Sequence, residues 1–202
     1  MTEHPDHGFL TEPEVTPEVR ASYDSDVADH GYVMNLSRVW AHSPAAHDRL
    51  FELLADLARL GGLTFRQRGI LVSAMASTAG DSYCALAWGG RLATEAGDAV
   101  AGSVLHHDDA GLEPADAALA AWARAVTRDA NATTAEDLEP LRAAGFDDRQ
   151  IFAITAFVAL RRAFSLVNDA LGVRPDRQLR DDASPTVREA VSFGRAPADR
   201  PS

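Results

Sequence analysis

The strongest constraint on the fold of this chain is a series of helix starts and stops with no strand pattern between them. Ser43 and Pro44 form the first clear start, because serine is a preferred N-cap residue and proline suits the first helical position. The apolar stripe that follows has helical spacing and is ended by a glycine pair at 61–62; its members are Leu50, Leu53, Leu54 and Leu57. No segment alternates apolar and polar residues as a half-buried strand does. The sequence therefore predicts an all-α fold.

Later helix starts of the same kind define the extent of the domain. Residues 64–67 have the pattern of a capping box, Pro114 suits a first helical position, and the last helix is expected from Asp148 to about Leu171. We predict one helical domain over residues 15–174. Residues 1–14 are expected to form an N-terminal arm and residues 175–202 a C-terminal tail, because both are rich in proline and charged residues.

The charge of the chain excludes several classes of partner. Acidic residues outnumber basic ones by 30 to 19, every basic residue is an arginine, and the formal net charge is −11. The only basic cluster is Arg161 with Arg162, so we expect no nucleic acid and no membrane surface as partner. The absence of lysine also excludes Schiff-base catalysis by lysine and a phosphate-binding loop of the usual kind.

Three features predict a cytoplasmic location. The N-terminus is acidic and shows no signal peptide, and the longest nearly apolar stretch, residues 151–160, is too short to span a bilayer. Cys84 is the only cysteine, so the chain cannot form an internal disulfide.

The stretch AGDSYCALAWGG places Cys84 one turn into a predicted helix, with Asp81 at the N-cap. Such a thiol can be a reactive nucleophile, a small buried apolar residue, or a ligand contact, and the sequence leaves these three open. The helix dipole lowers the thiol pKa, whereas the nearby Asp81 carboxylate raises it. With no imidazole on the next turn to hold a thiolate, we predict a thiol that stays protonated.

The residues around this thiol also carry a resemblance to a known family. Residues 63–90, LTFRQRGILVSAMASTAGDSYCALAWGG, resemble the signature region of the AhpD-like and carboxymuconolactone decarboxylase superfamily. Residues 30–57 and 132–160, with VNDALGVRPD at 167–176, are similar to other parts of its peroxidase-related branch, in the same order. The resemblance covers roughly residues 20–175 and implies an AhpD-like helical bundle.

The resemblance also implies a redox motif, which this chain keeps only in part. Active members have a Glu, then Cys-x-x-Cys, then a His four residues after the second Cys, and use them to reduce hydroperoxides. Matched residue by residue, the second Cys is Cys84, the first is Asp81, the His is Trp88 and the Glu is Gly69. The resemblance therefore implies a degenerate motif, which does not support a two-cysteine thiol peroxidase.

A pocket is expected around the thiol. Trp88 lies at i+4 from Cys84, on the same helix face, and its ring is expected to fill the space that the family uses for chemistry. Gly69 and Tyr83 are expected beside it. One of Arg161 and Arg162, which interrupt an apolar helix, is expected to line the pocket or to pair with a carboxylate, and so to anchor an acidic ligand.

Other polar residues are weaker candidates. His42 and His47 flank a predicted N-cap, and a place at the protein surface explains both, although a histidine near the pocket is a candidate replacement for the lost proton relay. The run at 106–109, His-His-Asp-Asp, is interpreted as a solvated loop, because adjacent loop residues point in different directions and no third ligand is evident. We expect no metal and no cofactor.

Three functions remain open at this point. The first is a hydroperoxide reductase that uses Cys84 alone and is recycled by an external thiol. The second is a non-redox enzyme acting on a small molecule, such as a decarboxylase-like lyase or a tailoring enzyme of specialised metabolism, in which Asp81, a His and an Arg do acid–base work. The third is a non-catalytic binding protein. The third includes a role as an assembly partner, so a small-molecule ligand is one option among these hypotheses, and the resemblance implies a homo-oligomer.

Overall fold

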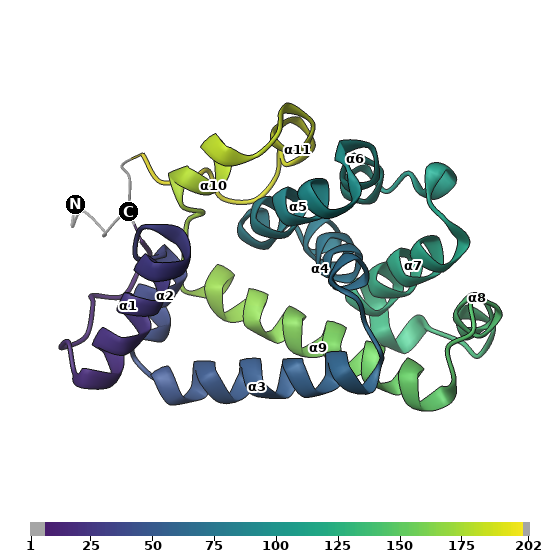
Figure 1. Ribbon diagram of the computed structural model, residues 1–202, viewed down its shortest axis with the longest axis horizontal. Helices are drawn as coiled ribbons and strands as arrows, with labels where there is room; N and C mark the ends of the chain where they lie inside the picture. The colour runs from purple at the N-terminus through teal and green to yellow at the C-terminus, as the bar shows by residue number, and fades with distance from the viewer. Residues whose placement is uncertain (1–6, 200–202) are drawn as a thin grey trace.

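The computed structural model describes residues 7–199, and every regular element in that range is helical (Figure 1). The longer helices are α1 (Pro17–His30), α3 (Pro44–Leu60), α4 (Phe65–Ala79), α5 (Ser82–Ala96), α7 (Pro114–Asp129) and α9 (Asp148–Ala170). The shorter ones are α2 (Asn35–Trp40), α6 (Asp98–His106), α8 (Glu139–Ala143), α10 (Arg177–Asp182) and α11 (Pro185–Ala190), with 3-10 turns η1 (Asp109–Gly111), η2 (Ala130–Ala132) and η3 (Glu136–Leu138). The predicted all-α fold is confirmed.

Helix α4 is the centre of the fold. Residues 69–76 are buried without a break, because the sequence GILVSAMA carries no charged side chain on any face of the helix. A helix that is apolar all round must be enclosed by others. Helices α5, α6, α7 and α9 all pack against α4, and together they hold most of the hydrophobic core.

The predicted starts of the main helices are confirmed. Thr64 with Gln67 forms a complete capping box at α4, and Asp147 with Gln150 forms a second one at α9. Ser43 occupies the N-cap position of α3, but its side chain makes no capping hydrogen bond. Of the two predicted signals, only Pro44 at the first helical position therefore favours the start of this helix. These local signals place the helix ends to within about a residue of where the sequence predicts them.

Helices α3 and α9 lie side by side along one edge of the molecule (Figure 1). Within the described chain, α9, with 23 residues, is the one helix long and apolar enough to cross a membrane by length and composition alone. It is therefore longer than the apolar stretch singled out in the sequence. Since α9 packs against α3, α4 and α7, its apolar residues serve the core of this fold.

The segment after residue 174 differs from the predicted tail. Helices α10 and α11 fold back over α5 and α6, seen in yellow in Figure 1, and Val187 of α11 is fully buried in the core. At the other end, the backbone N–H of Phe9 donates to the carbonyl of Leu171, and Glu12 pairs with Arg38 at 2.7 Å. Both arms thus contact their own chain, while their ends, residues 1–6 and 200–202, lie outside the described residues.

Candidate functional site

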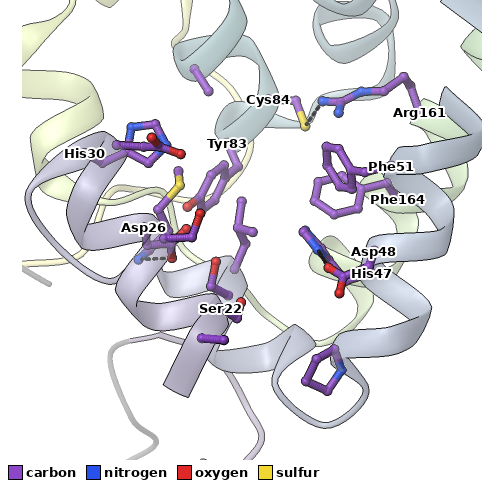
Figure 2. A pocket seen from close by; sticks show the side chains of 18 of the residues that line it. Ser22, Asp26, His30, His47, Asp48, Phe51, Tyr83, Cys84, Arg161 and Phe164 are labelled. Carbon is purple, nitrogen blue, oxygen red and sulfur yellow. Dashed lines mark hydrogen bonds and ion pairs between the residues drawn. The ribbon is translucent and has the colours of Figure 1, made fainter. Parts of the chain in front are cut away.

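A cavity of about 650 Å³ lies at the end of the molecule where α1 and α2 meet α3, α5 and α9. Figure 2 shows Ser22, Asp26 and His30 of α1 on one side, with Phe51, Phe164 and Arg161 on the opposite side. Cys84 and Tyr83, from the first turn of α5, lie on the wall between them. The predicted pocket around the thiol therefore exists, and its walls come from five helices.

The position of Cys84 follows from the cap of α5. Asp81 is the N-cap residue, and its Oδ1 accepts a hydrogen bond from the backbone N–H of Cys84 at 3.0 Å, as the sequence predicts. The Cys84 side chain is only 2% exposed. Burial raises the pKa of the Cys84 thiol well above its ordinary value, and the charge of Asp81 raises it further. The thiol is therefore protonated at neutral pH, with burial as the larger cause.

Arg161 lines the cavity and lies beside the sulfur. Its Nη2 donates a hydrogen bond to Cys84 Sγ over 3.7 Å, and its charge acts to lower the thiol pKa, against burial and Asp81 (Figure 2). The Arg161 side chain is only 4% exposed. Its guanidinium carbon lies 5.2–5.7 Å from three aromatic ring centroids, those of Phe51, Trp88 and Phe164.

Trp88 does not fill the pocket, in contrast to the expectation from its i+4 position. It is half-buried and forms part of the wall, with its ring centroid 5.8 Å from that of Phe65. The guanidinium carbon of Arg91, one turn further along α5, lies 5.2 Å from the same ring, and that of Arg161 lies 5.3 Å from it. The indole is thus held against cations at the edge of the cavity, which leaves the space open.

Tyr83 lines the cavity, as predicted, and its hydroxyl is hydrogen-bonded to a buried carboxylate. The hydroxyl donates a hydrogen bond to the buried carboxylate of Asp176, which also accepts the backbone N–H of Asn35 at 2.8 Å. Burial and the charge of Asp176 raise the pKa of Tyr83 well above its ordinary value. The phenol is therefore a neutral, oriented group in the cavity wall.

Three of the predicted site residues lie outside the cavity. A Cβ atom at Gly69 would meet Cδ1 of Leu92 at 3.2 Å, so this glycine permits the close approach of α4 and α5 and lines nothing. Arg162 donates a hydrogen bond to Ser165 on its own helix at 3.2 Å. Asp81 is fully buried behind Cys84 as its cap. The expected place of Gly69 in the pocket is therefore wrong, Arg161 is the arginine of the pair that lines the cavity, and Asp81 is found in its predicted capping role.

Several lining residues had no signal in the sequence. Arg91 is the second cation of the cavity, and Phe51 and Phe164 are its aromatic wall, but each is ordinary in its own helix. His47, a candidate for the proton relay, does line the cavity; in Figure 2 the two phenylalanine rings lie between it and Cys84. The acidic residues of α1 are visible in the sequence, but that they line this cavity is shown only by the structure.

The loop at 106–109 makes contacts of its own. His107 Nε2 lies 3.0 Å from the Ser77 hydroxyl, and Asp109 pairs with Arg124 at 2.5 Å. In the part of the chain that the structure describes, no three His, Cys, Asp or Glu side chains are grouped to hold a metal ion.

Asp169, near the end of α9, is expected to make the stability of the folded protein depend on pH. Burial and the charge of Asp81 raise its pKa from 3.8 to about 6. Between these two pH values the folded chain keeps a proton that the unfolded chain releases, so stability falls as pH rises from about 4 to 6. Asp169→Asn removes this loss. Because Asp169 is half-exposed, solvent screening limits the gain at pH 7 to about 1 kcal/mol, or about 2–4 °C in Tm.

Thermal unfolding of Asp169→Asn and the unaltered protein at pH 4, 5, 6 and 7 checks this expectation. The difference between them should be absent at pH 4 and full at pH 7. Asp24→Asn, at an exposed position of α1, is the matched control and should change Tm little at any of these pH values. A gain from Asp169→Asn that is equal at pH 4 and pH 7 would contradict the assigned pKa.

Comparisons with known proteins identify the fold. No protein-family model matches the chain, and no curated protein matches it. Solved structures do match it, among them the following two. An AhpD-core, uncharacterized peroxidase-related protein from Ralstonia eutropha JMP134 has a TM-score of 0.76 and 26% identity, over 88% of this chain and 96% of that chain. An uncharacterized peroxidase-related protein from Silicibacter sp. TM1040 has a TM-score of 0.75 and 22% identity, over 89% and 97%. The chain has the AhpD-like all-α fold.

Proposed function

We propose that this chain is an AhpD-like protein of the peroxidase-related type that does not run a two-thiol peroxidase cycle and uses its cavity to bind a small organic molecule. The observation that carries the proposal is the content of the cavity wall. It holds one thiol, deeply buried and protonated, beside an open space of about 650 Å³.

A two-thiol cycle requires groups that this site lacks. A thiolate attacks the O–O bond of a hydroperoxide, which gives a sulfenic acid and releases an alcohol. A second thiol then condenses with the sulfenic acid, forming a disulfide and water, and an external dithiol reduces that disulfide. Cys84 is the only cysteine of the chain, so the second step has no partner sulfur.

The first step is also disfavoured here. The nucleophile is the thiolate, and burial together with Asp81 keeps Cys84 protonated, although Arg161 acts in the opposite direction. Trp88 and Gly69 stand where the family resemblance places a histidine and a glutamate, so neither position supplies a proton shuttle. The groups that shift the Cys84 pKa include no histidine.

The open cavity favours a binding function over an inert scaffold. Its volume falls within the range typical of small-molecule sites, and its walls combine aromatic rings with a few oriented polar groups. If Trp88 filled the cavity, the structure would favour a non-catalytic protein without a ligand. The indole instead lies at the edge of the cavity. The support is therefore for a non-redox site that holds a ligand.

A hydroperoxide assay tests the redox half of the proposal. The full chain and its Cys84→Ser variant are compared for consumption of cumene hydroperoxide, with dithiothreitol as the reductant. We expect equal rates for the two proteins, both at the level of the reductant alone. Turnover that disappears with Cys84→Ser would overturn the proposal and identify a single-cysteine peroxidase, and intact-mass detection of a sulfenic acid on Cys84 would confirm that reversal.

A further inference from the structure

We infer that the cavity binds an organic anion, a carboxylate carried on a flat apolar body, with the carboxylate against the guanidinium groups of Arg161 and Arg91. The inference rests on the proposed function, since it names the ligand class of the same cavity. It follows from the charges of the wall, the aromatic rings beside them and the acidic face opposite.

The two buried arginines of the described chain differ in their partners. Arg124, 6% exposed, pairs with the carboxylate of Asp109 at 2.5 Å and donates to the carbonyl of Val104 at 2.9 Å. Arg161, 4% exposed, has no carboxylate within ion-pair distance among the described residues, and its guanidinium donates to Cys84 Sγ instead. A buried cation is costly unless it is paired, so an anion bound in the cavity would supply the counter-charge that no carboxylate gives Arg161 at ion-pair distance.

Arg91 adds a second cation to the same wall. It also has no ion-pair partner among the described residues, and burial and the charge of Arg161 lower its pKa. Both guanidinium groups lie against the ring of Trp88. The chain has eleven more acidic than basic residues, so carboxylates are abundant. Two partly or fully buried arginines without a carboxylate partner are therefore unexpected in this chain. A bound anion would neutralise their mutual repulsion, and a carboxylate matches the planar guanidinium donors.

The rest of the cavity defines the body of the ligand. Beside Arg161, the rings of Phe51 and Phe164 face the cavity and pack edge to face, with centroids 5.2 Å apart (Figure 2). These rings favour a flat apolar body next to the carboxylate. On the far side, α1 presents Glu18, Asp26 and Asp29, which repel a second negative charge at that end. The site therefore favours an anion with one carboxylate over one with a carboxylate at each end.

Isothermal titration with three probes of one shape tests this ligand class: 2-naphthoate, its neutral amide 2-naphthamide, and naphthalene-2,6-dicarboxylate. The full chain should bind naphthoate at least about tenfold more tightly than the amide, the size expected for a charged hydrogen bond to a buried cation. The dicarboxylate should bind more weakly than naphthoate.

Two substitutions assign the preference to the cavity. Arg161→Met should reduce the preference for naphthoate over the amide to less than about twofold, because the charge that selects the carboxylate is gone. Arg162→Met, at the next position on α9 and outside the cavity, is the matched control and should keep the full preference. In the absence of ligand, Arg161→Met should keep or raise the Tm, since it removes an unpaired buried charge, which also shows that the variant is folded.

The inference is overturned if no naphthoate binding is detected, if the amide binds as tightly as naphthoate, or if Arg162→Met loses the preference as fully as Arg161→Met. Each of these results leaves the hydroperoxide comparison untouched. Conversely, peroxide turnover that depends on Cys84 would overturn the proposed function without changing the preference for a carboxylate.

Discussion

Gly69→Glu, which restores the glutamate that the family resemblance places at this position, is expected to destabilise the protein by about 3–5 kcal/mol. Gly69 is buried where α4 meets α5, and a Cβ atom there already meets Leu92 Cδ1 at 3.2 Å. A glutamate would have to displace Leu92, which is itself fully buried, and would place a carboxylate in the core without a partner. Urea unfolding followed by circular dichroism measures the loss.

Gly90→Glu is the matched control for this substitution. Gly90 is a helical glycine of α5, and a Cβ atom there has no neighbour within 4 Å. The same charge at this position should therefore be neutral or stabilise the helix by about 0.5 kcal/mol, since glutamate is a better helix former than glycine.

A double substitution assigns the effect to the contact with Leu92. Leu92→Ala alone should cost about 2–5 kcal/mol because it leaves a cavity. Gly69→Glu combined with Leu92→Ala should cost clearly less than the sum of the two, because the new side chain enters the space that the leucine leaves. Additive losses, or a Gly69→Glu protein as stable as the unaltered chain, would contradict the close packing of α4 on α5.

Alkylation of Cys84 by iodoacetamide at pH 7.5 is expected to be at least about 100-fold slower in the folded protein than in the protein unfolded in urea. The thiolate is the reacting form; burial both shields the sulfur and raises the thiol pKa, and each tenfold loss of thiolate lowers the rate tenfold. Because Cys84 is the only cysteine, intact mass reports its labelling without ambiguity.

The charges around the sulfur predict the order of labelling rates among folded variants. Asp81→Asn removes the carboxylate that raises the thiol pKa and keeps a good N-cap residue, so its rate should exceed that of the unaltered protein. Arg161→Met removes the cation that lowers the thiol pKa, so its labelling rate should be lower than that of the unaltered protein. Labelling of the folded chain as fast as in urea, or the reverse order of the two variants, would refute the account of a buried, protonated thiol.

The parts of this site that could be predicted from the sequence are those formed within one or two helix turns. The capping of α5 by Asp81, the place of Cys84 at its third residue and the capping boxes of α4 and α9 all depend on residues three positions apart. Hydrogen bonds of that reach are decided by residue type and spacing alone. The burial of residues 69–76 of α4 also follows from their composition, because a helical stretch without charged side chains has to be enclosed.

The position of Trp88 depends on more than its helical spacing. Helical spacing correctly puts its side chain on the face of Cys84, and it does line the cavity. Spacing does not decide where the ring finally rests. The cations of Arg91 and Arg161 and the ring of Phe65 hold the indole at the wall, and two of these three groups lie on other helices.

The sequence alone thus determined the helices, their ends and the immediate surroundings of the thiol, because these depend on interactions between neighbouring residues. Only the tertiary structure decided which groups face the cavity. Arg161 reaches Cys84 across 77 residues of sequence, and Asp176 reaches Tyr83 across 93. Contacts of that range are set by how whole helices pack, with α9 against α3 and α4. They also depend on the segment after α9, which folds back over α5 and α6. That packing brings together two arginines that no carboxylate of the described chain pairs with, and from it the ligand proposed here follows.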